Sequence, residues 1–162
     1  MRLVPKDFEP PTLVKKDYIA KQMTVADTRA DYDAVMSSID IIHKTRGGTW
    51  PNSDLTYEDD LADLGWHQRE HDFRTNFCYV VYSPDEKEYI GSIYFYAPGE
   101  PMPNAKSVEG VDVNISWWIT QKKYDEGLYD QLSRDIKQWV ETAWPFNKVC
   151  YVNKELPKEF DV

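Results

Sequence analysis

The clearest hydrophobic pattern in the chain is a helical stripe in its last third. Apolar residues recur at spacings of three and four positions from Leu128 to Ala143, and Pro145 follows shortly afterwards. This period places them on one face of an α-helix, and a proline cannot continue that helix. The pattern predicts an amphipathic helix over 128–143 that buries one face.

Strand-like patterns precede this helix. Residues 111–119 alternate between two sets, Val111, Val113, Ile115, Trp117 and Ile119 against Asp112, Asn114, Ser116 and Trp118. A period of two predicts a strand. Two runs rich in aromatic and β-branched residues, 77–82 and 89–97, flank a polar linker with the composition of a hairpin turn. Shorter strands are predicted at 18–23 and 148–152.

Capping signals predict two helices in the first half of the chain. A hydroxyl residue followed three positions later by an acid occurs at Thr24–Asp27 and again at Thr56–Asp59. In this arrangement the two side chains cap backbone N–H groups reciprocally. The apolar spacing that follows predicts helices over 25–39 and 56–74. Glycines and a proline predict a loop at 45–51.

The first 17 residues contain Pro5, Pro10 and Pro11, which prevent a continuous helix and predict an extended N-terminal arm. Residues 18–162 then form a single domain with the element order β-α-α-β-β-β-α-β. This order predicts a mixed α/β fold built on a mixed central sheet.

The composition narrows the range of partners and compartments. The 162 residues carry a formal charge of -9, and no stretch gathers five or more lysines and arginines. Neither nucleic acid nor an anionic membrane is therefore expected as a partner of this acidic protein. No run of eighteen apolar residues and no signal-peptide pattern is present, which predicts a cytoplasmic protein. Cys78 and Cys150 lie in apolar runs and are expected to be reduced core residues.

Three segments resemble the GNAT family of acetyltransferases. Met23–Asp27 looks like the family's first strand turning into its first helix, and Tyr89–Tyr94 resembles the start of its third strand. The strongest resemblance is Val113–Thr120, a fourth strand leading to a helix that contains Gly127–Leu132. The similarity covers about residues 18–153. It implies the family's fold and the transfer of an acetyl group from acetyl-CoA to an amine of a small molecule or a protein.

The resemblance also implies where the cofactor binds. In the family, the fourth strand lends backbone groups to the pantetheine, and amides at the following helix start hold the pyrophosphate. A helix N-terminus attracts phosphate through its free N–H groups and its partial positive charge. The residues expected to bind acetyl-CoA are Trp118, Ile119, Thr120, Lys122, Lys123, Gly127 and Leu128.

The pyrophosphate turn departs from the family's pattern of Arg or Gln, two residues, Gly, one residue, and Gly or Ala. Gly127 is kept, but Tyr124 and Tyr129 occupy the other two positions. Asp125 and Glu126 also place carboxylates where an anion would bind. These departures leave open an alternative function, a GNAT-fold domain that has lost catalysis and binds a ligand or a protein partner.

Acetyl transfer needs a base, a donor for the oxyanion and an acid for the leaving thiolate. The family's carboxylate on the fourth strand corresponds here to Asn114, so Asp112 is the nearest carboxylate that could act, through a water. Its alternative role is that of a half-buried strand residue paired to a lysine. Tyr94, with Tyr96 and Tyr124 as further candidates, could supply the acid; the alternative is that all three are core or wall aromatics. Asn153 matches an asparagine common in the family.

The amine site of the family lies between the first two helices and the central strands. The residues expected around it here are Trp50, Tyr57 and Trp66, with the acidic set Glu58, Asp59, Asp60 and Asp63. Carboxylates near the pocket suit a cationic substrate. A solvated acidic helix face would explain the same residues.

The segment His67-Gln68-Arg69-Glu70-His71 suggests a second kind of site, one that binds a metal ion. This string has the H-x-x-E-H spacing of the inverted zinc metallopeptidases, in which both imidazoles lie on one helix face. Such a site needs a third ligand further along the chain. A zinc hydrolase therefore remains an alternative, and the two histidines are otherwise expected on the surface or in a cleft.

The chain ends nine residues after Asn153, so the family's C-terminal arm is expected to be short or missing. An exposed final strand can pair with a strand of another chain. A homodimer through the C-terminal strand is therefore a further expectation.

Overall fold

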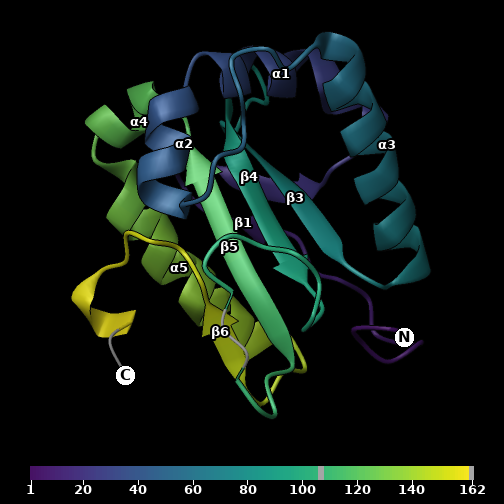
Figure 1. Cartoon of the computed structure of the whole chain (residues 1–162). Helices are drawn as coiled ribbons and strands as arrows, with labels where there is room; N and C mark the ends of the chain where they lie inside the picture. Colours follow the sequence, from purple (N-terminus) through teal and green to yellow (C-terminus); the bar gives the residue numbers. More distant parts are fainter. Residues whose placement is uncertain (106–107, 161–162) are drawn as a thin grey trace.

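A central six-stranded sheet organises the molecule (Figure 1). The computed structural model describes residues 1–105 and 108–160 of the chain. In both chain order and sheet order, the strands are β1 (Leu13–Val14), β2 (Ile19–Gln22), β3 (Phe77–Tyr82), β4 (Tyr89–Tyr96), β5 (Val113–Ile119) and β6 (Val149–Tyr151). Neighbouring strands are antiparallel from β1 to β5, whereas β6 runs parallel to β5. The sheet is therefore mixed, as the sequence predicted.

Helices cover both faces of this sheet (Figure 1). They are α1 (Thr28–Met36), α2 (Ile39–Arg46), α3 (Tyr57–Phe73), α4 (Gln121–Asp125) and α5 (Leu128–Ala143). The first three pack on one face and α5 packs on the other. In the described residues, no helix is both long enough and apolar enough to cross a lipid bilayer.

The three central strands are buried on both faces. All residues of β3 and β5 are buried, and adjacent side chains of β5 point to opposite sides. Trp117 joins the core beneath α5, while Trp118 joins the core beneath α1, α2 and α3. The alternation in the sequence therefore predicted the strand correctly, but its more polar face is covered as completely as its apolar face.

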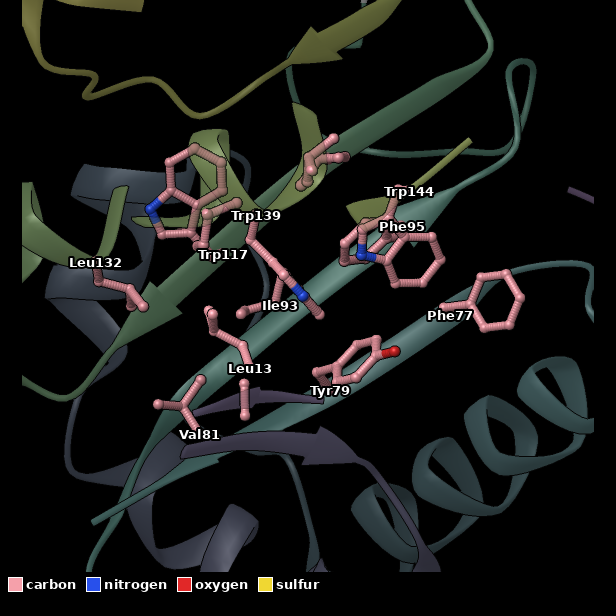
Figure 2. Packing of buried hydrophobic residues seen from close by; sticks show 14 of the residues in the cluster. Leu13, Phe77, Tyr79, Val81, Ile93, Phe95, Trp117, Leu132, Trp139 and Trp144 are labelled. Atoms are coloured by element: carbon pink, nitrogen blue, oxygen red, sulfur yellow. The ribbon is translucent and has the colours of Figure 1, made fainter. Parts of the chain in front are cut away.

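Figure 2 shows the larger core, between the sheet and α5. Phe95 stacks on Trp144 with ring centroids 4.4 Å apart, and Trp139 packs edge-on against Phe95 at 5.7 Å. Trp117 adds a hydrogen bond across the interface, since its Nε1 donates to Ser133 of α5 at 3.1 Å. These contacts fix α5, and with it the turn that leads into this helix, relative to β5.

The first helical region differs from the single helix predicted over 25–39. Val25–Asp27 form a 3₁₀ turn, α1 ends before Ser37, and the unpredicted helix α2 follows. The Ser37 hydroxyl donates to the carbonyl of Ala34 at 2.8 Å, which competes with continued helical bonding. Ser38 then becomes the N-cap of α2. The prediction of one continuous helix was wrong because it counted apolar spacing and ignored the two serines.

The other elements follow the predicted patterns more closely. Strand β3 and helix α5 begin and end at the predicted residues, and β4, β5 and β6 are slightly shorter than predicted. Both predicted capping boxes are formed, at Thr24 and at Thr56. The short helix α4 was not predicted.

The N-terminal segment lies against the domain. Val4 and Leu13 are buried in the core beneath α5, and β1 extends the sheet beyond β2. At the other end, a 3₁₀ turn at Lys158–Phe160 is the only regular element after β6 in the described residues. The C-terminal arm is therefore short within the part of the chain that the structure describes.

Candidate functional site

A cavity of about 270 Å³ opens between the helices α1, α2 and α3 and strand β4. It is lined by Met23, Asp31, Arg46, Trp50, Asp60, Asp63, Leu64, His67, Tyr94, Tyr96, Pro101 and Pro103. This cavity is the candidate acceptor pocket, and we use that name for it below. It combines aromatic walls with charged groups of both signs.

Regular elements hold the charged groups of the acceptor pocket in place. Asp60, Leu64 and His67 follow one another at i, i+4 and i+7 on α3, which puts them on one helix face. Asp31 comes from α1, and Arg46 is the last residue of α2. The pocket is therefore assembled where three helices converge over β4.

Two carboxyl groups are buried together in the pocket. Asp31 is 2% exposed and accepts hydrogen bonds from the hydroxyl groups of Tyr89 and Ser92. Asp60 is 1% exposed, and the Asp31 carboxyl is its only hydrogen-bonding neighbour among the described residues. Burial, followed by the neighbouring Asp31 carboxyl, raises the pKa of Asp60 to about 9, against a lowering by His67. The pair therefore holds a proton at neutral pH.

His67 supplies a positive charge beside these acids. Burial lowers its pKa, but Cys78 and Glu70 outweigh that effect and raise the pKa of His67 to about 10. Glu70 accepts from the ring at 3.3 Å and is itself held by the side-chain amide of Asn76. The imidazole also faces the ring of Tyr94, with centroids 6.0 Å apart.

Arg46 is the second cation of the pocket, and it is only 6% exposed. Its Nε donates to the hydroxyl of Ser116 at 3.0 Å, and its guanidinium lies 4.3 Å from the ring centroid of Tyr94. The ring of Trp50 lies 5.8 Å away. Stacking on aromatic faces stabilises a guanidinium without neutralising it.

The predicted substrate residues divide between the pocket and the outside of α3. Trp50 lines the acceptor pocket, and so do Asp60 and Asp63 of the predicted acidic set. Tyr57 instead packs against Tyr32 and Arg29, with ring centroids 6.0 Å apart in the first case. Trp66 is 60% exposed on the outer surface of α3.

The three predicted catalytic residues lie in three different places. Tyr94 lines the acceptor pocket, and its hydroxyl accepts from Trp118 Nε1 at 2.9 Å. Asp112 lies outside this pocket and accepts from the backbone N–H groups of Asn147 and Lys148 at 2.7 and 2.9 Å. That carboxylate ties the loop before β6 to the start of β5.

Asn153 closes the gap that opens between β5 and β6. The regular pairing of these strands ends near Ile115, where the N–H of Val152 donates to the Ile115 carbonyl at 3.0 Å. The side chain of Asn153 then accepts from the N–H of Trp117 at 3.0 Å and donates to its carbonyl at 2.9 Å. It also donates to the hydroxyl of Tyr129 at 2.7 Å. Asn153 therefore acts as one additional rung of the sheet.

The residues expected to bind the cofactor lie together at the end of β5 and in the turn after it. Trp118 and Ile119 are fully buried, and Thr120 caps α4 by accepting from the N–H of Lys123 at 3.3 Å. Because the N–H of Thr120 donates to Ile90 of β4, the alternation of an antiparallel ladder points the N–H of Ile119 away from β4. This N–H faces the side on which β6 diverges.

The pyrophosphate turn differs from an open loop, because it contains the helix α4. The N–H groups of Tyr124, Glu126 and Gly127 donate to carbonyls within the turn at 2.9 to 3.1 Å. Gly127 has a φ of 88° and caps α5, so the free N–H groups of that helix begin at Leu128. A side chain at position 127 would be strained by this left-handed backbone.

Charged groups around this turn are paired with one another. Lys122 and Lys123 both contact Glu88, at 2.9 and 3.3 Å, and Lys123 also contacts Glu126 at 3.0 Å. The hydroxyl of Tyr124 donates to Glu155 at 2.6 Å. An incoming anion would have to compete with these carboxylates for the two lysines.

The two histidines of the H-x-x-E-H string have different surroundings. His67 lines the acceptor pocket, whereas His71 packs edge-on against Phe77 with centroids 4.8 Å apart. Burial lowers the pKa of His71 to about 4. In residues 1–105 and 108–160, no three His, Cys, Asp or Glu side chains are arranged to hold a metal ion. A third zinc ligand is therefore missing from this part of the chain.

Three charged residues of the pocket, Asp31, Arg46 and His67, were not identified as substrate-site residues from the sequence. One signal was available for the α3 residues. Polar residues at 60 and 67 share a helix face with the buried Leu64, and polar groups on a buried face are uncommon unless they are satisfied or functional. Arg46 carried no such signal, because its helix was not predicted.

Comparison with known proteins gives the family of the fold. No family model and no curated protein matches the chain. The ribosomal-protein-S5-alanine acetyltransferase from Vibrio fischeri matches in structure with a TM-score of 0.64 at 11% identity, over 86% of this chain and 72% of that one. A ribosomal L7/L12 α-N-protein acetyltransferase in complex with coenzyme A gives a TM-score of 0.59 at 13% identity, over 80% and 68%.

A third solved structure, an apo nucleotide-linked sugar GNAT, gives a TM-score of 0.57 at 10% identity, over 87% of this chain and 71% of that one. These proteins differ in their acceptors and share one architecture. The chain has the fold of the GNAT acetyltransferases, as the resemblance of residues 18–153 predicted. At these identities the likeness establishes the fold and leaves the activity to the residues of the site.

Proposed function

We propose that the protein transfers an acetyl group from acetyl-CoA to an amine bound in the acceptor pocket. The observation that carries this proposal is the Asp31–Asp60 pair, which is buried beside β4 and has no lysine or arginine partner in the described residues. A cation brought next to a buried carboxyl pair favours its ionised form and is itself stabilised. An ammonium group is the natural partner for a carboxyl pair.

In its ionised form, which a bound ammonium favours, the same pair could serve as the base and take one proton from the ammonium. The free amine would then attack the thioester carbonyl, forming the C–N bond and breaking the C–S bond. The leaving thiolate would take up the second proton, which the attacking nitrogen loses as it becomes an amide. The outward-facing N–H of Ile119 is the candidate donor to the developing oxyanion.

A second candidate is a GNAT-fold binding domain without catalysis. The observation in its favour is that the turn's N–H groups are used within α4 instead of facing an open cradle. The segment after β6 also spans the donor side, where the N–H of Glu155 donates to Thr45 of α2 at 3.0 Å and its carbonyl accepts from Tyr129 at 2.6 Å. Under this alternative, only the acceptor pocket would bind a ligand.

Thermal unfolding with acetyl-CoA, free CoA and desulfo-CoA separates the two candidates. With a micromolar dissociation constant, a millimolar ligand should raise the stability by about 4 kcal/mol, which corresponds to a shift of several degrees. A shift with acetyl-CoA is the expected result, followed by release of free thiol when an amine is added. No shift with any of the three compounds would overturn the transferase proposal in favour of the binding domain.

The acids of the turn provide a more specific prediction. Replacing Asp125 with Asn and Glu126 with Gln should tighten CoA binding by about three- to tenfold, because each carboxylate opposes a phosphate at the start of α5. Titration calorimetry with CoA measures this change. Glu141→Gln, at the far end of α5, is the matched control and should have no effect. Unchanged affinity in the double variant would place the phosphates elsewhere.

A further inference from the structure

The acceptor pocket contains a buried guanidinium without a carboxylate partner and, beside it, a buried carboxyl pair without a lysine or arginine partner in the described residues. The guanidinium of Arg46 makes one side-chain hydrogen bond, to the neutral hydroxyl of Ser116. Within the described residues, no carboxylate oxygen lies within 4.0 Å of its nitrogens. Asp60 has only the Asp31 carboxyl as a hydrogen-bonding neighbour in the same part of the chain, and no lysine or arginine pairs with either acid. A buried guanidinium without a carboxylate is strongly unfavourable, and a buried carboxyl pair gains from a cation next to it, so a ligand with one group of each charge would suit both positions.

The sheet register indicates how far apart the two positions lie. Asp31 is held against Ser92 of β4, while Arg46 lies over Tyr94, two residues further along the same strand. Ser116, which binds Arg46, is the cross-strand partner of Tyr94. Two residues along a strand correspond to about 7 Å. One small ligand can span this distance with an ammonium at one end and a carboxylate at the other.

Apart from Asp63 and His67, the rest of the pocket wall is apolar or aromatic, and the pocket is small. Met23, Leu64, Trp50 and Tyr96 belong to this part of the wall, and the cavity measures about 270 Å³. Cavities that enclose drug-sized ligands usually begin near 300 Å³ and extend to several times that size. The occupant is therefore compact, with an apolar part as well as two charged groups.

We propose that the amine acceptor is a free α-amino acid with an apolar side chain. Its ammonium would bind the Asp31–Asp60 pair, its carboxylate would bind Arg46, and its side chain would pack against Trp50 and Tyr96. This inference rests on the proposed function for the fate of the amine, but not for binding itself. It also excludes a protein N-terminus as the preferred acceptor, because a peptide has no carboxylate next to its α-amine.

Titration calorimetry without acetyl-CoA tests the proposal directly. The probes are L-leucine, L-methionine and L-phenylalanine, each paired with its amide, which keeps the ammonium and the side chain but removes the negative charge. At least one amino acid is expected to bind, with its amide at least tenfold weaker, because a charged bidentate contact to arginine would be lost. Equal binding of acid and amide, or no binding of any of the three amino acids, would overturn the proposal.

Variants of the pocket residues identify the groups that bind the ammonium and the carboxylate of the amino acid. Arg46→Met keeps an apolar chain over Tyr94 and should abolish the difference between the amino acid and its amide, while Arg46→Lys should retain part of it. Asp60→Asn should weaken both ligands. Arg134→Met, which removes an exposed arginine from α5, is the matched control. Circular dichroism establishes that each variant is folded, and a folded Arg46→Met that still prefers the acid would contradict the assignment.

The failure of this inference can be distinguished from failure of the proposed function. If an amino acid binds and acetyl-CoA gives no thermal shift, the amino-acid site stands and the transferase proposal fails. If acetyl-CoA binds and none of the three amino acids does, the zwitterion proposal fails and the donor site stands.

Discussion

Replacing Asp60 with asparagine is expected to make the protein more stable above neutral pH and, at the same time, to weaken its binding of an amine. The carboxyl group has a pKa of about 9 in the folded protein, compared with an ordinary value of 3.8. The folded state therefore binds more protons than the unfolded state between these two values. Its stability must fall as the pH rises through that interval. An amide stays neutral and avoids this loss.

The gain should be on the order of 1–3 kcal/mol at pH 8, and it should shrink as the pH falls below the ordinary value of 3.8, where the wild-type carboxyl group is protonated in both the folded and the unfolded state. Urea unfolding of wild type and variant at several pH values measures it. Glu58→Gln changes an exposed acid on the same helix and should stay within about 0.5 kcal/mol of wild type. A variant that is no more stable than wild type at pH 8 would show that Asp60 is satisfied by groups of the protein itself.

The second large effect is expected at Asn153. Its side chain satisfies the N–H and the carbonyl of Trp117 and the hydroxyl of Tyr129, all in a buried setting. Asn153→Ala leaves these groups without partners, which should cost about 2–4 kcal/mol and lower the Tm by roughly 5–15 °C. Thermal unfolding followed by circular dichroism measures the loss.

Asn147→Ala is the matched control for this change, because Asn147 is exposed and makes no side-chain hydrogen bond to the described residues. It should leave the Tm nearly unchanged. An equal decrease in Tm in both variants would show that the effect is not specific to the junction of β5 and β6. A small loss at Asn153 would mean that the strands separate there at little cost, leaving the backbone of Trp117 accessible to a ligand.

The fold could be predicted from the sequence wherever one hydrophobic period, that of a helix or that of a strand, extends over a whole element. The helix 128–143 and the strand 77–82 were predicted correctly because their apolar patterns extend over the whole element. The helices α2 and α4 were missed because they are short and are held by tertiary contacts. The Ser38 hydroxyl, for example, accepts from the N–H of Gln121, which lies far away in the sequence. The helix propensities of the residues and the hydrophobic period of the sequence contain no information about such contacts.

The site was less predictable than the fold, for a similar reason. Trp50, Tyr94 and Asp60 were identified because the resemblance indicated their region, and all three line the acceptor pocket. Arg46 and Asp31 become pocket residues only when three helices converge, and no local pattern encodes that convergence. The residues expected to bind the cofactor lie together at the end of β5 and in the turn after it, and their role in binding acetyl-CoA stays a prediction.

The opposite orientations of Trp117 and Trp118 have a practical consequence. The indole N–H of Trp118 donates to Tyr94 in the pocket wall, whereas that of Trp117 donates to Ser133 beneath α5. Two neighbouring residues therefore give NMR reporters on opposite sides of one strand. A ligand that enters the pocket should shift the Trp118 indole resonance and leave that of Trp117 in place, so a single spectrum of the ¹⁵N-labelled protein locates the binding event on one face of the sheet.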